Sequence, residues 1–158
     1  MGLLGCLAKE ISVKGGALID SFFVSEDKKY AGSYFYENRS GQKFLVFAFD
    51  AYRVSERAFK QYARGKQIEK FVNFTGKRLP ATLLGNPDCY MLCKENEDET
   101  AVWIGNFFTD ECLNTAVILD GEYKDVKFIN CNGRLSENKV IVDKIAPFTS
   151  VGFTAKKY

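Results

Sequence analysis

Residues 89–106 read CYMLCKENEDETAVWIGN, two apolar runs joined by the polar stretch Glu95–Glu99. Short apolar runs separated by turn residues predict a β-hairpin. The same pattern continues outward, and we predict strands at 89–94, 100–107, 114–119, 126–131, 139–142 and 149–156. The turns between them contain Asp120-Gly121, Asn132-Gly133, Glu137-Asn138 and Ala146-Pro147. Six short strands at such close spacing predict a small β-sandwich or barrel.

The first half of the chain combines strands with one helix. Residues 7–24 predict one or two strands around a turn at Lys14-Gly15-Gly16. A hairpin is predicted from two apolar segments, Tyr34–Tyr36 and Lys43–Phe49. The second segment is almost entirely apolar, so we expect both of its faces to be covered. Residues 55–74 predict a helix capped by Ser55 and ended by Gly76. Its apolar residues fall on two opposite faces around Gly65, which indicates either a break there or packing on two sides.

These patterns predict an α+β protein that is mostly β. We expect residues 1–78 to form a sheet with one helix and residues 79–158 to form an antiparallel β-sandwich, because the pattern changes after Gly76 and Pro80. A single merged domain is the alternative.

The composition excludes several classes of function. The chain has 158 residues, is 46% hydrophobic and 27% charged, and carries a net charge of +2, which does not indicate a nucleic-acid-binding protein. It contains no histidine, which excludes Ser-His-Asp and Cys-His catalysis and His-ligated zinc. Neither Gly2-Leu3-Leu4-Gly5 nor Lys14-Gly15-Gly16 matches a phosphate-binding loop, so we expect no cofactor. No apolar run is long enough for a membrane helix and no secretion signal is visible, so we expect a cytoplasmic protein.

The five cysteines, Cys6, Cys89, Cys93, Cys112 and Cys131, follow no metal-ligand spacing. Cys89 and Cys93 are expected to face the same side of one strand, but no second pair completes a zinc site. We therefore expect no metal, and buried, reduced thiols.

Two kinds of residue could form a site. Paired carboxylates would allow glycoside hydrolysis without histidine, and the candidates are Asp20, Glu37, Asp50, Asp110, Glu111 and Asp120, although no spacing pairs them. Exposed aromatic rings could stack against sugars, and the candidate ligand-binding residues are Tyr34, Tyr36, Trp103, Asn106 and Asp110. The alternative is that Trp103 belongs to the core and that Tyr34 and Tyr36 belong to a half-buried hairpin.

A resemblance extends over residues 30–158. Several short motifs resemble the C-terminal region of large bacterial glycoside hydrolases. They are Leu79-Pro80-Ala81, Leu84-Gly85-Asn86-Pro87, Ala101–Phe107 with Asp110, Tyr123–Gly133, Ile145–Phe148 and Gly152-Phe153. In those proteins a catalytic barrel precedes a flavodoxin-like or amidotransferase-like domain and a terminal β-sandwich. A barrel alone takes about 250 residues, so the resemblance implies an accessory role and assigns no catalytic residue to this chain.

The sequence thus favours a non-catalytic accessory or assembly domain of a glycoside-hydrolase-like protein. Its expected partners are other domains or subunits of a carbohydrate-active enzyme, with neither nucleic acid nor membrane among them. The alternatives are a carbohydrate-binding module and a small glycosidase that uses two carboxylates. Either a fragment of a longer protein or a stand-alone relative fits the resemblance.

Overall fold

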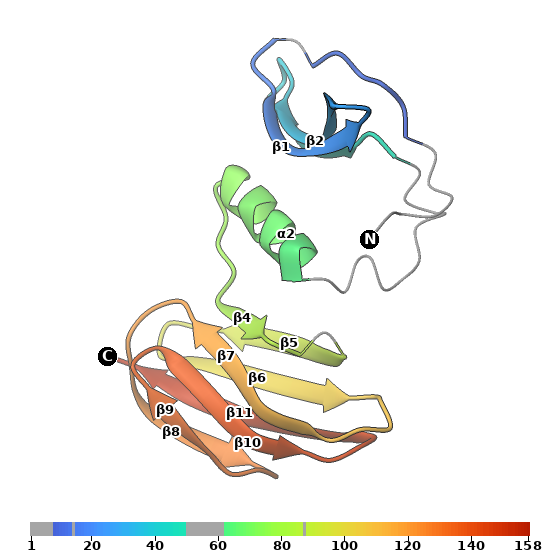
Figure 1. The fold of residues 1–158 in the computed structure, drawn as a ribbon. Helices are drawn as coiled ribbons and strands as arrows, with labels where there is room; N and C mark the ends of the chain where they lie inside the picture. The colour runs from blue at the N-terminus through green and yellow to red at the C-terminus, as the bar shows by residue number, and fades with distance from the viewer. Residues whose placement is uncertain (1–7, 14, 50–61, 87) are drawn as a thin grey trace. The chain divides into compact units, whose positions relative to one another are not determined.

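The structure, a computed structural model, describes residues 8–13, 15–49, 62–86 and 88–158. The chain divides into two compact units, Met1–Arg78 and Leu79–Tyr158 (Figure 1). Strands dominate both units, and the described residues contain one α-helix of thirteen residues. The predicted fold class, α+β and mostly β, is confirmed.

The first unit contains a three-stranded antiparallel sheet of β1 (Leu18–Ser25), β2 (Lys28–Glu37) and β3 (Lys43–Phe47), in that order. Glu26 and Asp27 join the first two strands with φ of 49° and 65°, as a two-residue hairpin turn with two positive φ angles requires. In the second connection, the side-chain oxygen of Asn38 accepts hydrogen bonds from the backbone N–H groups of Ser40 (3.0 Å) and Gln42 (2.9 Å). The predicted hairpin between β2 and β3 is confirmed.

One of the one or two strands predicted over residues 7–24 is present as β1, but two finer expectations for this unit were wrong. Ile11 and Val13 lie outside any strand, and the segment before β1 joins the sheet only through an isolated bridge between Ala8 and Phe49. Strand β3 is not covered on both faces, because Phe44 is exposed. An apolar run does not reveal which face remains open, since burial depends on what packs against the strand.

Helix α2 (Tyr62–Phe74) packs on this sheet through Arg64, Gln67, Phe71 and Phe74. The rings of Phe71 and Phe74 stack on Phe35 at 6.0 and 5.6 Å. Those four residues follow helical spacing, but two of them are polar, which explains why the apolar stripe is unclear in the sequence. The helix continues through Gly65, and Ile68, expected on a second packed face, is exposed. Gly76 ends the helix with φ of 78°, as predicted, whereas the Ser55 cap lies outside the described residues.

A buried polar contact joins α2 to the sheet. Gln67 is almost completely buried, and its amide donates to Ser33 Oγ (2.6 Å) and to Asp20 Oδ2 (2.5 Å). Lys70 Nζ lies 3.0 Å from Asp20 Oδ1 and supplies a counter-charge to that carboxylate.

We expect Gln67→Met to destabilise the first unit by about 1–3 kcal/mol, because the buried Ser33 hydroxyl and the Asp20 carboxylate lose a donor while the packed volume is retained. Hydrogen exchange of the β1 and β2 amides measures the loss. Exposed Gln42 provides the matched control: equal effects of Gln67→Met and Gln42→Met would contradict the structural role of the buried amide.

The second unit is an antiparallel β-sandwich of two four-stranded sheets that face each other (Figure 1). One sheet contains, in spatial order, β4 (Ala81–Leu84), β7 (Cys112–Leu119), β10 (Lys139–Ile145) and β9 (Gly133–Ser136). The other sheet contains, in spatial order, β5 (Cys89–Glu95), β6 (Glu99–Asn106), β11 (Thr149–Lys157) and β8 (Tyr123–Ile129). The predicted β-sandwich is confirmed, and the strands β4 and β9 are additions to the six predicted strands.

The core of the sandwich lies between these sheets. Most of its fully buried apolar side chains come from alternate positions of the central strands: Ile104, Val117, Leu119, Val140, Val142, Phe153 and Ala155. Such alternation leaves one face of each antiparallel sheet outside the core. Among the described residues, no helix is both long enough and apolar enough to cross a membrane.

Candidate functional site

The outer face of the β5-β6-β11-β8 sheet carries exposed aromatic residues. Along β6, Val102 and Ile104 point into the core, so Trp103 between them points outward. Trp103 is 36% exposed, and Tyr90 on β5 and Phe107 after β6 are 49% and 54% exposed. The alternative that Trp103 belongs to the core was therefore wrong. The strand is apolar on both faces, so its sequence does not indicate which face is buried.

Tyr90, Trp103 and Phe107 form an aromatic cluster. The Phe107 ring lies 5.6 Å from that of Tyr90 and 6.2 Å from that of Trp103, measured between centroids. Gly105 lies at the centre, opposite Tyr90 in the strand register. A Cβ on Gly105 would lie 2.5 Å from Cη2 of Trp103 and 2.9 Å from Cε2 of Phe107. The two rings therefore meet over a backbone position that has no side chain.

Next to this cluster, the outer face of the sheet carries exposed aliphatic side chains and a glycine. In the strand register, exposed Leu92 lies beside Trp103 on one side and Gly152 lies beside it on the other. Exposed Ile129 is the next residue across the sheet, beside Gly152. A Cβ on Gly152 would lie 2.7 Å from the carbonyl oxygen of Val102. The close approach of the two strands thus requires glycine there and leaves a shallow position between Trp103 and Ile129.

A groove with a volume of about 720 Å³ occupies the far part of the same sheet. It is lined by residues of β6, β8 and β11 and the turn after β8: Glu99, Asp125, Lys127, Phe128, Ile129, Asn130, Thr154 and Lys156. Ile129 belongs both to this groove and to the row that starts at Leu92. The outer face is therefore aromatic at one end and charged at the other.

Asn106 supports the aromatic cluster from inside. Its side chain is fully buried, donates to the carbonyl oxygens of Asp110 (2.7 Å), Ala146 (3.3 Å) and Ile145 (3.4 Å), and accepts from the N–H of Phe108 (3.1 Å). Asn106, predicted as a ligand-binding residue, is thus a buried side chain whose hydrogen-bonding groups face the protein. Asp110 is exposed, and its backbone holds the loop that carries Phe107.

The five predicted binding residues do not share one sheet. Tyr34 and Tyr36 lie half-buried on β2 in the first unit, and the Tyr36 ring stacks on that of Phe44 at 6.4 Å. Trp103, Asn106 and Asp110 lie in the second unit. Sequence reasoning missed Tyr90 and Phe107, although the two-residue period of Tyr90 and Leu92 could have indicated an exposed row.

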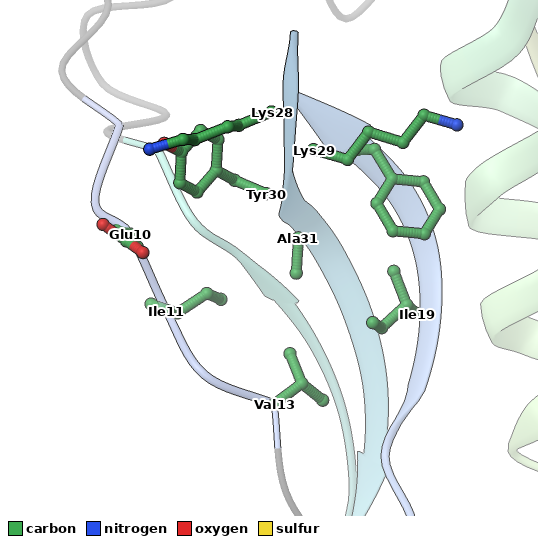
Figure 2. Close-up of a pocket in the computed structure, with 9 residues that line it drawn as sticks. Glu10, Ile11, Val13, Ile19, Lys28, Lys29, Tyr30 and Ala31 are labelled. Atoms are coloured by element: carbon green, nitrogen blue, oxygen red, sulfur yellow. The ribbon is translucent and has the colours of Figure 1, made fainter. Parts of the chain in front are cut away.

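The first unit has a separate pocket of about 580 Å³. Figure 2 shows Glu10, Ile11 and Val13 from the segment before β1 facing Ile19, Tyr30 and Ala31 from the hairpin. Lys28 and Lys29 line the same pocket (Figure 2). The apolar alternation of Ile11 and Val13, taken as a strand in the sequence, thus belongs to a pocket wall.

Within each unit, the candidate carboxylates have different neighbours. Asp20 contacts Gln67 and Lys70, and Glu37 lies 3.7 Å from Lys43. Asp110 and Glu111 precede β7 while Asp120 follows it. Because β7 has eight residues, its two ends are about 25 Å apart. Glycoside hydrolysis needs two carboxyl groups about 5–10 Å apart. Glu111 also forms an ion pair with Lys144, and Asp50 lies outside the described residues.

Two thiols meet in the core of the sandwich. Cys89 and Cys93 face the same side of β5, as predicted, but Cys89 contacts Cys112 of β7, with 3.4 Å between the sulfur atoms. Burial, together with the hydrogen bond to Cys112, raises the pKa of Cys89 to about 12. Burial also raises the pKa values of Cys93 and Cys131. No group of three or more cysteine, aspartate or glutamate side chains suited to a metal ion occurs in the part of the chain that the structure describes.

Comparisons with known proteins find a structural similarity but no family. No family model matches the chain, and no curated protein matches it. Among solved structures, the chain is similar to Gan42B, a GH42 β-galactosidase, with a TM-score of 0.42 and 12% sequence identity. The similarity covers 85% of this chain and 17% of the β-galactosidase. The chain thus spans about a sixth of the length of that enzyme.

Proposed function

We propose that this chain is a non-catalytic accessory domain of a glycoside-hydrolase-like protein and that its second unit binds carbohydrate. The aromatic cluster of Tyr90, Trp103 and Phe107 is the observation that carries the proposal. Aromatic rings exposed on a rigid sheet provide a preformed surface for the apolar C–H face of a sugar ring. The resemblance of the sequence supports an accessory role.

Polar groups beside the cluster would determine how a sugar lies on it. Ser150 is exposed on β11 and pairs with Gly105, and exposed Lys94 follows Leu92 on the outer side of β5. Their hydroxyl and ammonium groups can bond sugar hydroxyls, while Trp103 supplies the stacking surface. The shallow position at Gly152 leaves room for a further sugar toward Ile129 and the charged groove.

Trp103 is the single tryptophan of the chain, so its fluorescence reports directly on the proposed site. We expect a neutral oligosaccharide from a panel of β-linked galacto-, gluco- and xylo-oligosaccharides to change the emission saturably. Trp103→Ala should weaken binding, measured by calorimetry, by about 5- to 150-fold, because a stacked aromatic ring is worth about 1–3 kcal/mol in the comparable stacking of bases.

Two further variants sharpen this test. Gly105→Ala retains all three rings but displaces Trp103 and Phe107, so it should also weaken binding. Leu113→Ala removes an exposed apolar side chain from the opposite sheet and should leave binding unchanged. Sugar binding that survives Trp103→Ala, or a complete lack of response across the panel, would contradict the proposal.

A second candidate function uses the same face to dock another domain or subunit. Leu92 and Ile129 flank Trp103 and are exposed, and aliphatic groups favour a protein partner over a sugar. Sedimentation of the full chain tests self-association. A dimer that dissociates on Leu92→Asp, together with no response to sugars, would favour docking to a second copy.

A further inference from the structure

We propose that Cys89 and Cys112 form a disulfide across the β-sandwich when the protein meets a low-molecular-weight disulfide such as oxidised glutathione. The two sulfur atoms lie 3.4 Å apart. A disulfide bond is about 2.05 Å long, so they need to approach by only about 1.4 Å, which small rotations of both side chains can provide. This inference is independent of what the outer face binds.

The position of the pair makes the bond a link between the two sheets. Cys89 lies at the start of β5 and Cys112 at the start of β7, which belong to different sheets. Both side chains are buried in the same core cluster. Tyr90 follows Cys89 directly, so the link would form beneath the aromatic cluster.

The other described cysteines are not suited to this bond. Cys93 shares β5 with Cys89, four residues along the strand, which separates them by about 13 Å. Cys131 instead has its thiol 3.5 Å from the carbonyl oxygen of Gly152. Cys93 and Cys131 therefore provide matched controls in the same unit.

The reaction consists of two thiol–disulfide exchanges. The thiolate of one cysteine attacks the small disulfide, forms a mixed disulfide and releases one small thiolate, which takes up a proton. The second protein thiolate then attacks the protein sulfur of the mixed disulfide and releases the second small thiolate. The protein loses two hydrogens and the small disulfide is reduced to two thiols. The high pKa of Cys89 makes its thiolate scarce near neutral pH, so the exchange is expected to be slow there.

The full chain is incubated with oxidised glutathione, and its thiols are then counted after denaturation. We expect two of the five thiols to disappear, a mass loss of about 2 Da, and a cross-linked peptide pair that contains Cys89 and Cys112. The oxidised protein should melt at least about 10 °C higher, because the bond closes a loop of more than twenty residues in the unfolded chain.

Variants decide whether the assignment is correct. Cys89→Ser or Cys112→Ser should abolish both the mass loss and the melting shift, while Cys93→Ser or Cys131→Ser should leave both unchanged. A triple variant in which Cys6, Cys93 and Cys131 are serine tests the pair alone. Oxidation that maps to other cysteines, or a pair that stays reduced in the folded triple variant under conditions that oxidise its unfolded form, would overturn the proposal.

Discussion

Replacing Phe153 with alanine is expected to remove about 3–5 kcal/mol from the free energy of unfolding of the second unit. Phe153 is fully buried on β11, between β6 and β8, and its ring lies 6.3 Å from that of Phe128. The substitution removes the largest fully buried side chain and leaves a cavity that the two sheets cannot close. A unit of this size has a stability of about 4–12 kcal/mol, so much of it would be lost.

Urea unfolding followed by the fluorescence of Trp103 measures this effect. Phe148→Ala serves as a control, because Phe148 lies in the turn before β11 and is exposed. It should change the stability by no more than about 0.5 kcal/mol. Similar losses for the two variants would contradict the placement of the core between the sheets.

The second large effect is expected for Asn106→Asp, which retains the size of the side chain and changes its chemistry. The amide nitrogen of Asn106 faces three carbonyl oxygens, and a carboxylate oxygen there would be repelled by all of them. A buried charge without a partner costs about 3–5 kcal/mol. Because Asn106 holds the loop that carries Phe107, the variant should also weaken binding at the aromatic cluster.

The loss of folding stability in Asn106→Asp should depend on pH in a defined direction. Burial and the nearby carbonyl groups disfavour the charged form, so the folded-state pKa of the introduced carboxyl would lie above its unfolded value of about 4. The variant should then be most stable below about pH 4, where the protonated carboxyl can donate, and lose stability as pH rises through the folded pKa. Unfolding of Asn106→Asp and the parent chain at several pH values tests this, with Asn106→Ala as the variant that cannot titrate. A difference between Asn106→Asp and the parent that is constant with pH would contradict it.

Local turn chemistry made much of the fold predictable. The Glu137-Asn138 turn has Glu137 at φ of 57°, and Gly76 has φ of 78° at the helix end. The predicted strands that alternate regularly also occur in the structure. Strand β4 was missed because its four residues do not alternate, and β9 because it begins within the predicted Asn132-Gly133 turn. The helix was found, but its packing residues were not, since Arg64 and Gln67 contribute polar contacts to the interface with the sheet.

The candidate site was only partly visible in the sequence. Trp103 and Asp110 are exposed, but Asn106 is a buried support, and Tyr34 and Tyr36 belong to the other unit. Tyr90 and Phe107 join Trp103 through strand pairing and a loop after β6, and such contacts depend on register.

By itself the sequence determined where most of the strands and turns and the helix form, because backbone preferences and side-chain periodicity act over a few residues. It also excluded imidazole chemistry, since histidine is absent. The tertiary structure decided that Trp103 faces outward, that Asn106 faces inward and that Cys89 meets Cys112. A strand that is apolar on both sides has no local preference for either face, and only the packing of one sheet against another selects which side chains are buried.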